Sequence, residues 1–310
     1  MYIPPISIYA ISPRCSFYTH SANPPIHPHA QHPQSRHTMK ALLLATLLTA
    51  LCLPRTSATE LVYTGGQLST GDIAFHVIYV NYSPSPAFTR NISNFLADMP
   101  AIEPFFAVMN EYLPAAGSLL TGVACVSSTE WTAPSTNLTE PAVQAYIAGL
   151  GMSFTPSDVL LFMLAPDTQM AIVDNGRTAM SCREWCGVHL VAGSKNNFVP
   201  YAVIPSFGSQ CKKCSAPGLP KTGNPVWDLT TFVIHHEAAE LFTDTYENAT
   251  PALGAGFVNK GNGPGDKQAG LEIGDLCQDF SYTSAGNEAT GGRKYFLSKL
   301  WSNKANKCVP

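Results

Sequence analysis

The stretch Asp158-Val159-Leu160-Leu161-Phe162-Met163-Leu164 is apolar after its first residue and has the length of a β-strand. A strand that is apolar on both faces is typical of the centre of a sheet that is covered on both sides. Toward the N-terminus, the patterns alternate between strands at 73–80 and 119–126 and helices at 88–110 and 140–150. Prolines at 100 and 104 predict that the pattern at 88–110 forms two helices or one interrupted helix. The alternation predicts an α/β fold, a single layered domain with a mixed central sheet flanked by helices.

The second half of the chain has shorter elements and a longer loop. Short strands are predicted at 187–192 and 201–204, a loop rich in Gly, Pro, Lys and Cys at 206–227, a second loop at 258–270, and a strand or short helix at 293–301. The best helix candidate runs from Leu229 to Glu247, with Asp228 as its N-cap. No repeat of fixed period is found. No boundary divides residues 59–310, so we expect them to form one domain.

The N-terminal 58 residues have the pattern of a targeting segment. Residues 1–38 contain no Asp or Glu and are rich in Pro, Ser and His, which predicts a non-native or disordered extension. Met39 and Lys40 precede an apolar run at 41–53 that is too short to cross a bilayer, and small residues follow at 56–58. We therefore interpret residues 39–58 as a secretory signal peptide. The alternative is a genuine extension with a masked signal or a transit peptide.

The charge of the chain excludes two classes of partner. All 21 acidic residues lie beyond residue 58 with 14 of the 18 basic residues, so that part has a formal charge of −7. An acidic protein is poorly suited to bind nucleic acid or an anionic membrane surface. No later segment has the length and hydropathy of a transmembrane helix, so we expect no membrane span.

Seven cysteines lie beyond the predicted signal peptide: Cys125, Cys182, Cys186, Cys211, Cys214, Cys277 and Cys308. In a secreted protein they favour disulfides, and a four-thiolate zinc site from the middle four is the alternative. An odd number leaves one thiol over, and the apolar surroundings of Cys125 predict a buried free cysteine. Sequons at Asn91, Asn137 and Asn248 agree with secretion and predict a glycoprotein, whereas a proline follows the sequon at Asn81.

The segment His235-His236-Glu237-Ala238-Ala239-Glu240 concentrates ionisable groups in a chain with only 13% charged residues. On a helix, residues i and i+4 share a face, so His236 and Glu240 can hold one metal ion, as the histidines of H-E-x-x-H do. One reading of this stretch is therefore an active-site helix of the zincin type. Glu237 then stands where the general base of a metallohydrolase lies. We assign no role to His235, which we expect to face another way.

A helix supplies only two ligands, so a complete site needs others. Glu272, Asp275 and His189 are the candidates. Zinc is the metal that we expect first. Because Glu240 replaces the second histidine, a harder cation such as calcium or manganese is the alternative. A third reading has no metal and joins His236 to Glu272 or Asp275 by hydrogen bonds.

An ordered set of motifs resembles the EXORDIUM / phosphate-induced protein 1 family of secreted plant proteins. The motifs are Tyr63-x-Gly65-Gly66, Cys182-x3-Cys186-Gly-x-His189, Gln210-Cys211-x2-Cys214, His236-Glu-x-x-Glu240 with Thr243-Asp244, Glu272-Ile-x-Asp275-Leu-Cys277, and the end at 292–308. Thr245 departs from the family pattern, and the middle regions match poorly, so the chain resembles the family as a distant member would. It implies an extracellular or cell-wall protein that is linked to growth and nutrient responses, with an extracellular partner or a wall polymer as its contact. It places His189, His236, Glu240, Glu272 and Asp275 on family motif positions.

For the cysteines, we expect Cys182 to pair with Cys186, or these two to cross-pair with Cys211 and Cys214. The remaining pair is Cys277–Cys308, and Cys125 stays free. Two functions remain open. One is a non-catalytic secreted protein with a His/carboxylate metal site, and the other is a secreted peptidase-like metallohydrolase that uses His236, Glu237 and Glu240.

Overall fold

Strand β5 (Asp158–Leu164) lies at the centre of a five-stranded sheet with the order β3-β2-β5-β9-β8. In this computed structural model the described residues are 60–65, 68–102, 105–113, 120–155, 157–174, 176–194, 197–214, 224–244, 256–261, 270–277, 280–282 and 292–309. The predicted extension and signal peptide lie outside them. The other strands are β2 (Gly71–Val80), β3 (Leu120–Trp131), β8 (Val188–Ser194) and β9 (Asn197–Ile204). All neighbours pair in parallel except β8 and β9, so the mixed sheet is confirmed.

The central strands bury both faces, as the apolar run at 158–164 predicts. Along β5, Leu161 and Met163 belong to one hydrophobic core, whereas Leu160, Phe162 and Leu164 belong to the other. Successive side chains of a strand point to opposite faces, so one continuous apolar run serves both cores.

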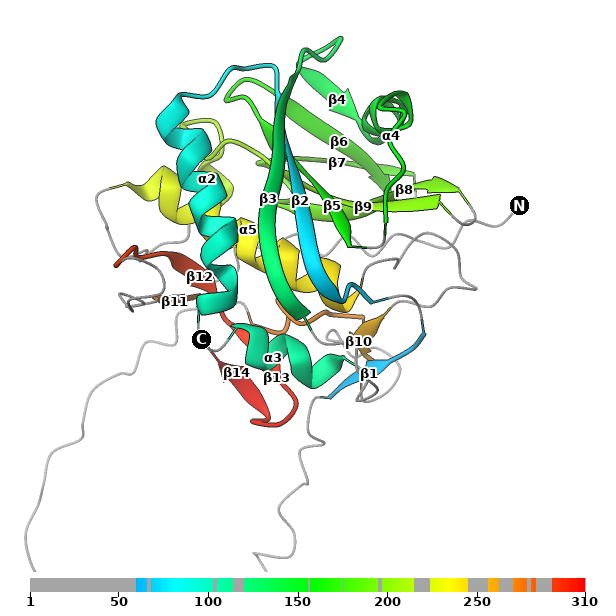
Figure 1. Ribbon diagram of the computed structural model, residues 1–310. Coiled ribbons are helices and arrows are strands. Elements are labelled where there is room, and N and C mark those ends of the chain that lie inside the picture. The colour runs from blue at the N-terminus through cyan, green and yellow to red at the C-terminus, as the bar shows by residue number, and fades with distance from the viewer. Residues whose placement is uncertain are drawn as a thin grey trace, which may run out of the picture. The chain divides into compact units, whose positions relative to one another are not determined.

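Helices on each face complete the layers (Figure 1). One face is covered by α2 (Pro86–Asp98), α3 (Phe105–Tyr112) and α5 (Pro225–Thr243), whose side chains join the first core. The other face is covered by α4 (Glu140–Gly149) and by a small sheet of β4 (Asn137–Thr139), β6 (Gln169–Asp174) and β7 (Arg177–Met180). A 3-10 turn, Met99–Ala101, separates α2 from the segment before α3, which confirms the break predicted from Pro100.

Short antiparallel pairs make up the rest of the second half. They are β1 (Leu61–Tyr63) with β10 (Phe257–Asn259), β11 (Phe280–Tyr282) with β12 (Phe296–Ser298), and β13 (Leu300–Ser302) with β14 (Lys307–Val309). The last predicted element is therefore strand, not helix. The loop predicted from Val258 is wrong for Val258 and Asn259, because β1 supplies a partner that is distant in sequence.

Helix α5 starts earlier than predicted. Its N-cap is Asn224, whose side-chain oxygen accepts a hydrogen bond from the backbone N–H of Trp227. Pro225 occupies the first helical position, where its fixed φ suits the helix. Asp228 is therefore not the cap; it lies in the first turn of α5. The helix ends at Thr243, and the predicted positions 245–247 lie outside the described residues.

Three disulfides tie the C-terminal half: Cys182–Cys211, Cys186–Cys214 and Cys277–Cys308. The cross-pairing is confirmed, whereas the Cys182–Cys186 pair and the four-thiolate zinc site are wrong. Cys125 is free as predicted, but it is only partly buried because it lies on β3, an edge strand of the sheet.

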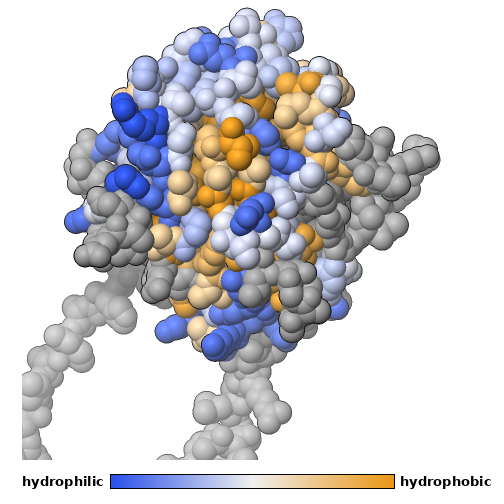
Figure 2. All heavy atoms as spheres, in the orientation of Figure 1, coloured by the Kyte–Doolittle hydropathy of each residue, from blue (hydrophilic) through white to orange (hydrophobic). Residues whose placement is uncertain are grey.

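Hydrophobic residues gather near the middle of the face drawn in Figure 2, in the region where Figure 1 places β3 and β2. Beyond Val123, most residues of β3 are at least partly exposed, as is common for an edge strand. Across the described part of the chain, no helix is both long and apolar enough to cross a membrane.

Candidate metal centre

Three segments bring ionisable side chains together on the α5 face of the sheet. Helix α5 carries His236, Glu237 and Glu240, strand β8 carries His189, and the turn at 270–277 carries Glu272 and Asp275. The histidine of β8 faces α5 because the next residue, Leu190, faces the opposite core. All six residues selected from the sequence therefore lie in one cluster.

The first group of possible ligands is His189, Glu240 and Glu272. The Nδ1 atom of His189 lies 3.4 Å from Oε2 of Glu240, and its Nε2 atom lies 3.4 Å from Oε2 of Glu272. Glu237 adjoins the group, with Oε2 at 3.3 Å from Nδ1 of His189. One ligand atom from each of the three residues lies within 4.8 Å of the others.

The second group is His236, Glu240 and Asp275. The Nε2 atom of His236 lies 3.1 Å from Oε1 of Glu240 and 3.7 Å from Oδ1 of Asp275. The contact between His236 and Glu240 is the i,i+4 pair predicted from the sequence. Glu240 therefore belongs to both groups, with one carboxylate oxygen directed toward each histidine.

The cluster is buried, and two of its ring nitrogens lack hydrogen bonds. Each of the six side chains is at most 12% exposed. Within the part of the chain that the structure describes, Nε2 of His189 and Nδ1 of His236 are buried without a hydrogen-bond partner. Buried polar atoms in native proteins are normally satisfied, so such atoms need an explanation, and an ion is one. These residues fit a metal ion.

The carboxylates control the protonation of both histidines. Burial alone would lower the pKa of His189, but the charge of Glu272 and hydrogen bonds to Glu237 and Glu240 raise it well above its ordinary value. Burial would also lower the pKa of His236, but the charge and hydrogen bond of Glu240 raise it to about 10. Without a metal, both histidines are therefore cationic at neutral pH.

The carboxyl groups of the cluster differ in the direction in which their pKa values are shifted. Burial would raise the pKa of Glu240, but the two histidines, His236 above all, lower it to about 2. Burial raises the pKa of Glu237, and burial together with the charge of Glu240 raises that of Asp275 well above its usual range. Of Glu237, Glu240 and Asp275, Glu240 is thus the one that stays ionised most firmly, and it is also the one that the two groups share.

Two glycines let the backbone approach the cluster, and the sequence interpretation passed over both. A Cβ atom on Gly274 would lie 2.6 Å from Nδ1 of His236 and 2.8 Å from Oε1 of Glu240. A Cβ atom on Gly187 would overlap the carboxylate of Glu237. The signal was present, because each glycine stands inside a motif that also contains a candidate ligand.

His235 faces away from the cluster, as expected. Its Nδ1 atom lies 3.0 Å from Oγ of Ser298, and its ring packs against Phe105 with the centroids 4.7 Å apart. Burial, followed by the charge of His236, lowers the pKa of His235 to about 3. It is therefore a neutral core residue.

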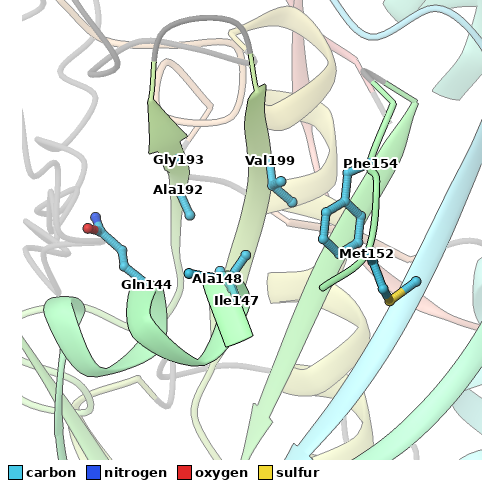
Figure 3. Close-up of a pocket in the computed structure, with 8 residues that line it drawn as sticks. All are labelled: Gln144, Ile147, Ala148, Met152, Phe154, Ala192, Gly193 and Val199. Atoms are coloured by element: carbon cyan, nitrogen blue, oxygen red, sulfur yellow. The ribbon is translucent and has the colours of Figure 1, made fainter. Parts of the chain in front are cut away.

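A pocket of about 240 Å³ lies elsewhere, between α4 and the far end of the sheet (Figure 3). Ile147, Met152, Phe154 and Val199 supply most of its apolar lining, and Gln144 supplies an amide. None of the six residues of the His/carboxylate cluster lines it.

The fold and the cluster define a disulfide-tied α/β protein with a buried His/carboxylate centre. The chain is similar to the protein EXORDIUM-like 3 of Arabidopsis thaliana, with 25% identity over 296 residues that cover 81% of this chain and 82% of that protein. This similarity supports the interpretation of the chain as a distant member of the EXORDIUM family. No family model matches the chain, and no solved structure matches it.

Proposed function

We propose that this chain is a secreted, extracellular or cell-wall protein of the EXORDIUM type, linked to growth or nutrient response, and that its His/carboxylate centre binds a divalent metal ion. The similarity to EXORDIUM-like 3 and the three disulfides fit an extracellular protein. Exposed Asn91 and Asn137 offer their sequons for glycosylation, whereas the Asn81 side chain is bonded to Ala133 and Thr168.

The observation that carries the metal proposal is the shared Glu240. Its two oxygens lie 3.1 Å from Nε2 of His236 and 3.4 Å from Nδ1 of His189. Imidazole nitrogens with carboxylate oxygens form a donor set for zinc, whereas calcium sites use oxygen ligands. Zinc is therefore the first metal to test and calcium the second.

Burial favours a structural role for the ion. A catalytic zinc keeps one position open for water beside a cleft. Here Glu240 and Glu272 are 4% and 3% exposed, and the pocket of Figure 3 is lined by other residues. An ion at this position would neutralise the carboxylates and join α5 to β8 and the 270–277 turn.

Metal analysis and thermal melts of the purified mature protein test this proposal. At one hundred times the dissociation constant, zinc adds about 2.7 kcal/mol of stability, which raises the melting temperature by roughly 5 to 10 °C. A chelator reverses the shift.

Both histidines must lose a proton to bind zinc, because their pKa values are raised. Zinc affinity should therefore rise about tenfold per pH unit for each proton released between pH 6 and 8, which calorimetry in two buffers measures. The proposal would be contradicted by a purified protein that contains no metal and whose melting temperature does not change with zinc, calcium or a chelator.

A metallohydrolase is the second candidate, and Glu237 is the observation that favours it. This carboxyl group follows His236 on α5, belongs to neither ligand group, and has a raised pKa because it is buried. A carboxyl group with a raised pKa beside a metal is suited to general-base or general-acid catalysis.

The variant Glu237→Gln separates the two candidates. If the centre is catalytic, Gln should abolish peptide hydrolysis and leave zinc content and the melting temperature nearly unchanged, because the base is not a ligand. If the centre is structural, the variant should have little effect on any measurement. His236→Ala is the comparison, and it should lose zinc in both cases. Hydrolysis that survives in Glu237→Gln would exclude Glu237 as the base.

A further inference from the structure

A second cluster of reactive side chains crosses three neighbouring strands on the other face of the sheet. Ser127 lies on β3, His76 on β2, and Asp158 at the start of β5. The Nδ1 atom of His76 lies 2.8 Å from Oγ of Ser127, and its Nε2 atom lies 2.9 Å from Oδ1 of Asp158. His76 shares its face with Ile78, which belongs to the α4-side core. The cluster is therefore separate from the metal centre.

The protonation pattern of this cluster follows from Asp158. Its Oδ2 atom accepts hydrogen bonds from the backbone N–H and the hydroxyl of Thr155, at 2.7 and 2.6 Å. Burial would raise the pKa of Asp158, but the bonds from Thr155 and His76 lower it. An ionised Asp158 accepts a hydrogen bond from Nε2–H of His76, which leaves the Nδ1 lone pair to accept the hydroxyl proton of Ser127. A nucleophile, a base and a group that orients the base are thus in line.

The nucleophile is accessible. Ser127 is exposed, whereas the side chains of His76 and Asp158 are 14% and 18% exposed. In the pairing of β2 with β3, Phe75 lies opposite Cys125 and the next residue, His76, lies opposite Ser127. Val126 therefore has no partner on β2 and forms a bulge in β3. Such bulges are frequent beside active sites, where they redirect a side chain.

The ring of Phe154 links the cluster to a neighbouring pocket of mixed lining. Phe154 lines the pocket of Figure 3 and meets the His76 ring edge-on, with the centroids 6.0 Å apart. The pocket volume of about 240 Å³ suits a small group rather than a polymer chain. Its lining mixes apolar side chains with polar groups, among them the amide of Gln144, and contains no charged side chain, so it favours an uncharged ligand.

We propose that Ser127 is a nucleophile, with His76 as its base and Asp158 as the residue that positions His76, and that it takes small carboxylic esters. Oγ of Ser127 bonds to the ester carbonyl carbon, its proton moves to Nδ1 of His76, and the ester C–O bond breaks. The proton then passes to the leaving alcohol. Water attacks the acyl-serine in the second step, gives its proton to His76, and releases the carboxylic acid as Ser127 regains a proton.

Labelling with a fluorophosphonate probe and peptide mass mapping test the nucleophile. The probe should form one Ser127 Oγ–phosphorus bond with loss of fluoride. Ser127→Ala should lose the label, and Ser128→Ala, which changes the next exposed residue of β3, should keep it. His76→Gln should slow labelling about a hundredfold or more. Labelling should persist with a chelator, which separates this proposal from the metal centre. An unlabelled Ser127 in the wild-type protein would overturn the proposal, and this result requires no variant to fold.

Hydrolysis of 4-nitrophenyl acetate tests the roles of the other two residues. Ser127→Ala should remove the activity. Asp158→Asn should lower kcat at least tenfold with KM little changed, because Asn no longer holds the required His76 tautomer. Asp158→Glu should restore part of kcat. Thermal melts confirm that each variant is folded. Equal hydrolysis by the wild-type protein and Ser127→Ala would overturn the assignment. So would a loss of kcat in Asp158→Asn that is fully explained by unfolding of the variant in its thermal melt.

Discussion

Replacing Glu240 by alanine is expected to lower the free energy of unfolding by about 3 to 5 kcal/mol, because it leaves two buried cationic histidines without their shared carboxylate. His236 and His189 lie 3.1 and 3.4 Å from its oxygens. The pKa of His236, about 10 in the intact protein, should fall toward its ordinary value. Zinc binding should be lost at the same time, since Glu240 belongs to both ligand groups.

Denaturant unfolding in the presence of a chelator measures the first effect, and metal analysis measures the second. Glu60→Ala is the matched control, because Glu60 is exposed at the start of the described residues. It should change neither quantity. Glu240→Gln, which keeps the shape and removes the charge, should also lose zinc. A Glu240→Ala protein that is as stable as the control would show that the histidines are not charged in the folded state.

Removal of the Cys277–Cys308 disulfide is expected to have the second large effect. The bond joins residues 31 positions apart, and in the chain-entropy model closing such a segment stabilises by about 3 to 4 kcal/mol. It also fixes the end of the 270–277 turn, which carries Glu272 and Asp275. The double variant Cys277→Ser/Cys308→Ser should therefore lose both stability and zinc affinity.

Thermal melts and zinc titration of this double variant provide the measurement. Cys125→Ser is the control, because Cys125 is the free cysteine and is only partly buried. It should leave the melt nearly unchanged. Mass mapping of a non-reduced digest must also find Cys277 joined to Cys308. A free thiol at either position in the native protein would contradict this prediction.

Local patterns were sufficient to predict most of the layered domain. The apolar run at 158–164 predicted the central strand, because a continuous apolar run of this length is typical of a strand covered on both faces. The break at Pro100 also follows from covalent geometry. The three-residue strands β1 and β10 could not be predicted, since they pair across almost two hundred residues and segments of that length carry little periodicity of their own.

Within the His/carboxylate cluster, the contact on helix α5 could be predicted from the sequence, whereas the contacts between α5 and other segments could not. The spacing of His236 and Glu240 determines that they share a face, so their contact follows from helical geometry. Nothing in local spacing brings His189 within 3.4 Å of Glu240, because β8 and α5 are separate elements. The sequence offered His189, Glu272 and Asp275 as candidate ligands from their residue types, but only the fold brings them to Glu240 and His236.

The sequence by itself determined the α/β class, the central strand and the helical His–Glu pair. These depend on periodicity and residue chemistry, which act over a few neighbouring positions. Only the tertiary structure decided the cross-pairing of the disulfides, the sharing of Glu240 and the line of Ser127, His76 and Asp158. Those contacts join segments that are distant in sequence. The line of Ser127, His76 and Asp158 depends in addition on strand register, because a shift of one residue would turn His76 to the opposite face of the sheet.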